Sequence, residues 1–158
     1  MAESLVAVTD LIIRADEIEA YSLPGDDAVY HSQCLIDRDG VRSTTLSMNR
    51  FTLKAGQHLH GLAHPIGADE CYYVLRGRAR LTIGGDAKTG VGAEIQEIGP
   101  DTAIFIPGGT FHAIQNLSET EEFVILTIWP RLPEPGSNPI YDGRRKAWGT
   151  SFRRKSTG

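Results

Sequence analysis

The chain has 158 residues, of which 41% are hydrophobic and 23% are charged, and its formal net charge is −4. This length suits one domain, and the acidic balance argues against a dedicated nucleic-acid surface, which needs positive charge to attract phosphate. No apolar run approaches the ~18 residues that cross a bilayer, and the N-terminus has no basic leader. The two cysteines, Cys34 and Cys71, are too few for a disulfide framework and are expected to be buried thiols. We therefore expect a cytoplasmic protein.

Glycine and proline are abundant and punctuate the predicted elements. Seventeen glycines and eight prolines favour short strands joined by tight turns over a helical fold. The segment 5–20 has the best helical pattern, but it lacks a convincing apolar stripe, so any helix there is short. We expect strands at 29–37, 44–53, 70–75, 78–83, 94–98, 103–106, 112–116 and 123–129, and a further strand through the histidines near residue 60. About nine short strands predict an all-β barrel or sandwich.

The composition changes after Pro130. The proline-rich segment 131–139 cannot form a central strand or a helix. The tail at 141–158 carries six basic residues, at 144–146 and 153–155, and such a run is usually a solvated surface. Trp148 and Phe152 indicate that the tail docks on the barrel or on a second subunit. We divide the single domain into an arm with the first strands (1–40), a barrel (41–130) and the proline-rich loop with the tail (131–158).

The densest group of potential metal ligands lies between residues 58 and 70. His58, His60 and His64 are followed by Glu70, and imidazoles with one carboxylate suit a divalent transition metal. Histidines two residues apart on a strand point to the same face, roughly 6.6 Å apart, so His58 and His60 can converge on one ion. His60 and His64 lie about 13 Å apart on a straight strand and converge only if the chain bends, which Gly61 permits.

This segment resembles the first cupin motif, whose pattern is Gly, five residues, His, one residue, His, three or four residues, Glu, six residues, Gly. Counted from Gly56, the residues His64, Glu70 and Gly77 match the pattern. Leu62 stands where the first histidine of the family belongs. The interval from His64 to Glu70 is one residue longer than the pattern allows.

A second segment resembles the second cupin motif, which is Gly, five residues, Pro, one, Gly, two, His, three, Asn. Pro107, Gly109, His112 and Asn116 match it in full, while Asp101 replaces the leading glycine. The resemblance covers roughly residues 40 to 130. It implies an all-β double-stranded β-helix, the jelly-roll barrel of cupins, with a short N-terminal helix or strand and an extended C-terminal tail.

The resemblance also implies a metal site. Because the first motif lacks one family ligand, we expect a shifted set of His60, His64, Glu70 and His112, with His58 in reserve. The ion would be one divalent transition metal: Fe, Mn, Ni, Zn or Cu. The alternative is that some of these histidines only form hydrogen bonds in the barrel mouth.

Glu70 has two possible roles, and Tyr72 shares its strand face. As a ligand, Glu70 is anionic. Without a metal it is a carboxylate in an apolar barrel, where a raised pKa suits a general base. Tyr72 can donate a proton to Glu70 or to a substrate, so both residues are candidate catalytic groups.

The sequence therefore favours a metal-dependent enzyme of dioxygenase, isomerase, cyclase or decarboxylase type, acting on a small organic acid, phenol or carbonyl compound. The alternative is a non-catalytic small-molecule-binding cupin with a structural or vestigial metal. The resemblance implies a homodimer, and we expect no nucleic-acid or membrane partner. The wall of the ligand site is expected to be apolar, and its candidate residues are Phe51, Phe105, Phe111, Phe123 and Trp129.

Overall fold

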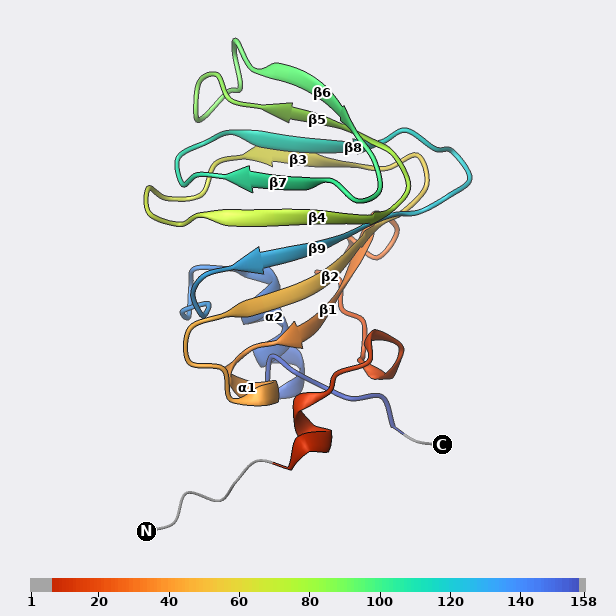
Figure 1. Ribbon diagram of the computed structural model, residues 1–158, viewed down its shortest axis with the longest axis vertical. Coiled ribbons are helices and arrows are strands. Elements are labelled where there is room, and N and C mark those ends of the chain that lie inside the picture. Colours follow the sequence, from red (N-terminus) through yellow and green to blue (C-terminus); the bar gives the residue numbers. More distant parts are fainter. Residues whose placement is uncertain (1–6, 157–158) are drawn as a thin grey trace.

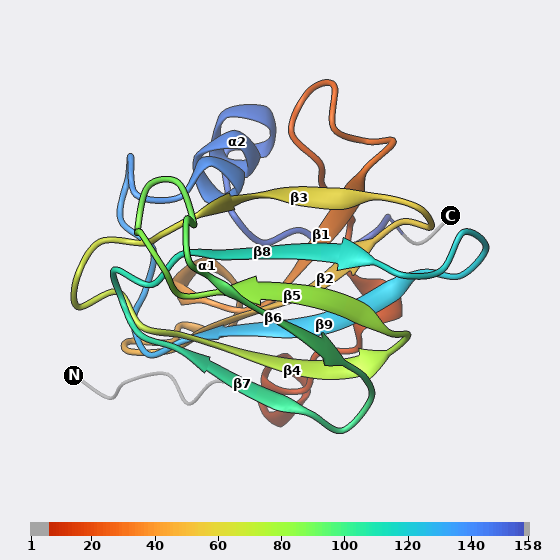
Figure 2. The same ribbon diagram turned by 90° about the horizontal axis from the view of Figure 1, so that it is seen from above.

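The computed structural model describes residues 7–156, which fold into nine strands in two facing sheets (Figure 1). One sheet has five strands, in the order β1 (Tyr30–Ile36), β2 (Ser47–Leu53), β9 (Phe123–Trp129), β4 (Glu70–Arg76) and β7 (Ala103–Ile106). The other has four, in the order β3 (His58–Leu62), β8 (His112–Asn116), β5 (Ala79–Ile83) and β6 (Glu94–Ile98). Figure 2 shows β3 near one side of the barrel and β7 near the other. The predicted all-β jelly-roll architecture is confirmed.

The strands follow the predicted alternation of buried and exposed side chains. On β4, Glu70, Tyr72 and Val74 are buried, whereas Tyr73 and Leu75 are exposed. Successive side chains of a strand point to opposite faces, so one face of β4 points into the barrel. The core between the sheets consists mainly of aliphatic and aromatic side chains: Phe51, Leu53, Val74, Leu81, Ile98, Ile106, Ile114, Phe123 and Ile125.

The N-terminal segment is less regular than a helix. Two 3-10 helices, Val8–Leu11 and Ala15–Glu17, occupy the stretch where a short helix was expected. A four-residue helix, α1 (Arg38–Val41), follows β1, and the Asp37 side chain caps it by accepting from the Gly40 N–H. Residues 1–6 and 157–158 of the predicted arm and tail lie outside the described residues.

The prediction of an extended tail was wrong for part of it. The tail contains a helix, α2 (Pro139–Trp148). Asn138 caps its first turn by accepting from the Tyr141 N–H, and proline at the first helical position suits the start of a helix. Gly149 ends the helix with φ +76°. These three local signals explain why the helix forms just after the proline-rich loop.

The tail docks on the barrel of its own chain. The Trp148 ring packs edge-on against Tyr21 with 5.3 Å between centroids. The Ser151 hydroxyl donates to Asp37, and the Ser151 N–H donates to Asp39, so the tail is bonded to the N-cap and to the first turn of α1. Figure 1 shows α2 beside β1 and β2. The homodimer stays a prediction, because these contacts lie within one chain.

Other sequence expectations concern the thiols and the membrane. Cys34 is buried, Cys71 is half-buried, and neither is in a disulfide. Within residues 7–156, no helix combines the length and apolar character needed to cross a bilayer. The cytoplasmic location stays a prediction.

Candidate metal centre

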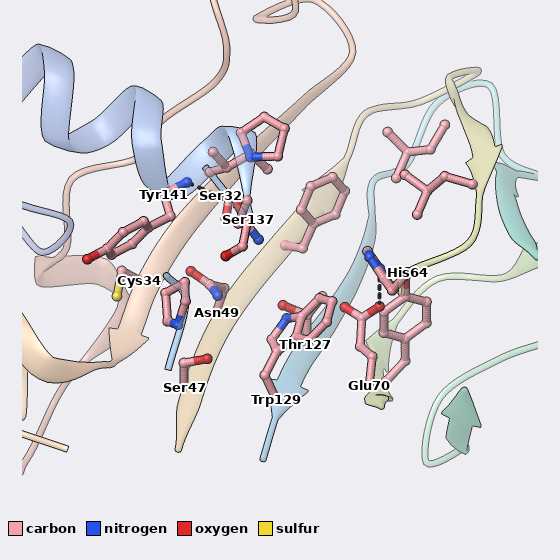
Figure 3. A pocket seen from close by; sticks show the side chains of 18 of the residues that line it. Ser32, Cys34, Ser47, Asn49, His64, Glu70, Thr127, Trp129, Ser137 and Tyr141 are labelled. Carbon is pink, nitrogen blue, oxygen red and sulfur yellow. Dashed lines mark hydrogen bonds and ion pairs between the residues drawn. The ribbon is translucent and has the colours of Figure 1, made fainter. Parts of the chain in front are cut away.

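Three side chains converge inside the barrel: His64, Glu70 and His112. One candidate ligand atom from each lies within 4.8 Å of the other two. His64 Nε2 is 3.2 Å from Glu70 Oε2 (Figure 3). His112 Nε2 is 3.7 Å from the same oxygen. Glu70 begins β4, His112 begins β8, and His64 lies on the loop between β3 and β4. The two sheets and one loop therefore supply a compact set of two imidazoles and one carboxylate.

The environment of His112 fixes the ring in a ligating form. Its Nδ1 lies 3.0 Å from the carbonyl oxygen of Thr110. A carbonyl oxygen only accepts, so Nδ1 carries the proton and the lone pair of Nε2 faces Glu70. Burial lowers the pKa of His112 below its ordinary value, which keeps the imidazole neutral. A neutral, oriented imidazole is the form that binds a metal.

The two motif segments hold each other in place around His64. The His64 carbonyl accepts from the Gly109 N–H at 2.7 Å, and Asp69 Oδ1 accepts from the Gly108 N–H at 3.0 Å. A Cβ on Gly108 would collide with the Pro65 carbonyl oxygen, so this close approach requires glycine. These contacts position the His64 loop against the segment that precedes His112.

Tyr72 lies next to the cluster on the inner face of β4. It is 7% exposed and Glu70 is 3% exposed. Burial, and then the Glu70 carboxylate, raise the pKa of Tyr72 well above its ordinary value. Tyr72 is therefore a phenol at neutral pH and keeps a proton that it could donate, and its catalytic role stays a prediction.

Leu62 occupies the position that a histidine ligand holds in the family pattern. It lies directly opposite His112 in the β3–β8 ladder. Its side chain is 48% exposed. A hydrocarbon side chain thus stands beside the cluster where a fourth donor atom would belong.

His58 and His60 do not join the cluster. The β3–β8 ladder has a bulge between Leu59 and Leu62, where two residues of β3 lie opposite one residue of β8. His58 lies opposite Gln115, in a row of exposed side chains on the outer face of the sheet. His60 lines the inner cavity, but the three converging ligand atoms do not include one from it. The structure therefore brings together three of the four predicted ligands, and coordination by His60 stays a prediction.

A cavity of about 460 Å³ opens beside the cluster. Of the five aromatic residues predicted for its wall, Phe51 and Trp129 line it. The prediction was wrong for the other three. Phe105 is 60% exposed, because its neighbours on β7 take the inward positions, and Phe123 is buried in the core. Phe111 packs near the glycines of β3 and of the β5–β6 loop.

Several polar cavity residues were not singled out from the sequence. They come from β1, β2, β9 and α2, and they are Ser32, Cys34, Ser47, Asn49, Thr127, Tyr141 and Arg144. The period-2 alternation within the predicted strands 29–37 and 44–53 would have found those on β1 and β2. Nothing in the tail pattern distinguished Arg144 from the other basic residues.

The two-sheet barrel with an imidazole–carboxylate cluster inside it defines a small jelly-roll protein with a candidate metal centre. The model of the cupin domain family matches residues 49–129. The chain belongs to the cupin family. An uncharacterised protein of Streptomyces coelicolor is 29% identical over 106 residues, which cover 67% of this chain and 84% of that protein.

Solved structures with the same fold are more distant in sequence. The polyketide cyclase RemF from Streptomyces resistomycificus matches with a TM-score of 0.63 and 20% identity, over 77% of this chain and 81% of that one. KdgF from a Halomonas species matches with a TM-score of 0.59 and 18% identity, over 76% and 94% of the two chains. Oxalate decarboxylase from Lactobacillus farciminis matches with a TM-score of 0.61 and 18% identity, over 75% of this chain. The match covers 32% of that decarboxylase, and these likenesses show the fold alone.

Proposed function

We propose that this chain is a metal-dependent enzyme that acts on a small organic acid, phenol or carbonyl compound. The observation that carries the proposal is the convergence of His64, Glu70 and His112 within 4.8 Å at the side of an open cavity. Two imidazoles and one carboxylate fit a divalent Fe, Mn, Ni, Zn or Cu ion and leave coordination positions for a substrate. When bound, such an ion supplies Lewis-acid polarisation of a carbonyl, enolate or phenolate oxygen.

The protein side chains around this site have separable tasks. His112 is held in one tautomer by Thr110, and Glu70 contributes the negative charge. Tyr72, protonated and facing the cavity, donates to an oxygen of the substrate. Phe51 and Trp129 contact the apolar part of the substrate and exclude water from it.

The solved structures that share this fold do not decide the substrate or the reaction. They include a polyketide cyclase and an oxalate decarboxylase. One fold supports many reactions. An experiment therefore has to distinguish dioxygenase, isomerase, cyclase and decarboxylase activity. The test is to remove metal with a chelator, reload Fe(II), Mn(II), Ni(II) or Zn(II) singly, and assay enolisable acids and phenols with and without oxygen. Turnover in one metal form, absent from the metal-free protein, is the expected result.

The Glu70→Gln variant separates the two roles of the carboxylate. If Glu70 acts as a ligand, the variant loses metal affinity, and excess metal restores activity. If it acts as a general base, the rate falls by about 10²–10⁴ and added metal does not restore it. We propose the ligand role, because Glu70 lies next to both histidines of the cluster.

A second function is a non-catalytic binding protein whose metal is structural or vestigial. Leu62 favours this alternative, because it removes one donor atom from the family set. A metal-loaded protein that binds members of the organic-acid panel but turns none of them over would support it.

A further inference from the structure

The end of the cavity beneath α2 contains a buried arginine without an ion-pair partner. Arg144 is 3% exposed, and none of the ion pairs found in residues 7–156 includes it. Its terminal nitrogens donate to Asn49 Oδ1 and to Ser32 Oγ, each at 2.8 Å. Its Nε has no hydrogen-bond partner. A buried charge is costly unless it is compensated, and both acceptors here are neutral.

Arg144 determines which atoms its two neighbours present. A guanidinium only donates, so Asn49 must turn its carbonyl oxygen toward Arg144 and its NH₂ group away from it. In the same way Ser32 accepts from Arg144, and its own O–H is left to donate. Asn49 is half-buried and lines the cavity. The arginine therefore makes this end of the cavity a set of hydrogen-bond donors, polarised by a positive charge.

The Asp37 carboxylate belongs to a different set of contacts. Asp37 also borders this end of the cavity, but it is 2% exposed. Its Oδ1 accepts from the Gly40 N–H and its Oδ2 accepts from the Ser151 hydroxyl. Asp37 therefore anchors α1 and the tail, and it makes no ion pair within 4.0 Å with Arg144.

The strand register gives the distance from these donors to the metal cluster. In the sheet register, Asn49 of β2 lies opposite Thr127 of β9, and Thr127 lies opposite Tyr72 of β4. Tyr72 is two residues beyond Glu70 on the same strand. Figure 3 shows Asn49 and Thr127 between Cys34 and Glu70. Two strand spacings separate β2 from β4, and the two residues from Tyr72 to Glu70 add about 6.6 Å at right angles, so the donor end lies roughly 12 Å from the cluster. Apolar side chains, including Phe51 and Ile125, line the cavity as well.

We propose that Asn49, positioned by Arg144, binds a carboxylate at the far end of a ligand whose near end reaches the metal. This inference rests on the proposed function for the near end. It assigns the substrate class as an organic acid with a ring-sized apolar body between its carboxylate and its metal-binding oxygen. Donors held by a cation match a carboxylate, because charge-assisted hydrogen bonds are about twice as strong as neutral ones.

A matched pair of probes tests the inference by calorimetry on the full chain loaded with Zn(II). The probes are 4-carboxybenzohydroxamate and 4-methylbenzohydroxamate, which carry the same metal-binding group and ring. We expect the carboxylate probe to bind about tenfold more tightly or better. Asn49→Asp replaces the donor with a carboxylate that pairs with Arg144, so it should abolish this preference by weakening binding of the carboxylate probe. Gln115→Glu makes the same change of charge on the outer face and should leave the preference intact.

The ratio of the affinities for the two probes also tests whether Arg144 positions Asn49. Arg144→Met should remove the preference for the carboxylate probe, and Arg144→Lys should restore part of it, which lost packing alone would not do. Equal affinity of the two probes for the metal-loaded wild type overturns the inference and leaves the metal centre standing. If no metal binds, the proposed function fails. The inference is then tested by measuring the affinities of the metal-free chain for 4-methylbenzoate and for 4-methylbenzamide. Tighter binding of the carboxylate is expected, and equal binding overturns the inference.

Discussion

The two segments that build the candidate metal centre are held in different ways. In the segment from Pro107 to Asn116, His112 and Asn116 are both buried, and backbone or side-chain hydrogen bonds fix each of them. In the segment from His58 to His64, β3 is mostly exposed and its ladder is interrupted by a bulge. One side of the site is therefore preorganised, and the other depends on a short irregular strand and the loop after it.

This difference indicates how the cluster of His64, Glu70 and His112 can form although leucine stands at position 62. His112 and Glu70 project from well-packed strands, so their positions do not depend on β3. His64 is tied to the second motif through the Gly109 N–H. Changes on β3, such as leucine at position 62, therefore leave the three clustered side chains in place.

The largest expected effect comes from the preorganised side. His112→Ala should weaken binding of Zn(II) by at least about 100-fold, because a buried, oriented ligand is lost. His58→Ala, on the outer face of β3, is the matched control and should change the affinity less than twofold. Competition with a chelating dye measures both, and circular dichroism shows whether the fold is intact. Equal affinities for the two variants would remove His112 from the site.

The second prediction concerns the stability of the same side. Asn116 donates to the backbone carbonyls of Lys54 and Glu121 and accepts from the Ser118 N–H. Asn116→Ala should lower the free energy of unfolding by about 2–4 kcal/mol, because buried groups lose their partners. Gln115→Ala, at the exposed neighbouring position, should change it by less than about 0.5 kcal/mol. Urea denaturation compares the two, and similar losses would contradict the structural role of Asn116.

The third prediction concerns the irregular side. Leu62→His places an imidazole opposite His112, where the family pattern has a ligand. The affinity for Zn(II) should rise about tenfold, because a fourth donor atom joins the set. Leu62→Phe introduces a ring without a lone pair and should give no increase. If Leu62→His binds metal no more tightly than the wild type, β3 does not lie where the ladder places it.

The smallest expected effect comes from His60. It lines the cavity but lies outside the three converging ligands, so His60→Ala should weaken Zn(II) binding less than tenfold. His64→Ala should weaken it much more. The same dye competition applies. A loss for His60→Ala as large as that for His64→Ala would show that β3 moves to bring His60 onto the ion.

The sequence predicted the parts of the site that depend on local spacing. His112 and Asn116 belong to a turn and strand whose residues all match one pattern, and Glu70 follows from its interval to Gly77. Spacing could not show whether the His60 side chain reaches the cluster. Its direction depends on the bulge in β3, and the bulge depends on how β3 pairs with β8. Arg144 is one of six basic residues in the tail, and its burial follows from where α2 docks.

In the fold, too, features set by local sequence were predictable and features set by non-local contacts were not. Alternating side chains predicted the strands and therefore the all-β class. The helix α2 was missed, although Asn138 before Pro139 is a local helix-start signal and Gly149 is a stop signal. Docking of this helix on the barrel is a non-local contact that spacing does not reveal.

The central claim is that His64, Glu70 and His112 hold one metal ion. Anomalous X-ray diffraction from crystals of the protein, purified without added metal and then soaked in Zn(II), tests it most directly. We predict one strong peak within about 2.0–2.2 Å of His64 Nε2, His112 Nε2 and a Glu70 oxygen. A peak bound by His58 or His60 without these three residues, or no peak in the barrel at all, would contradict the account.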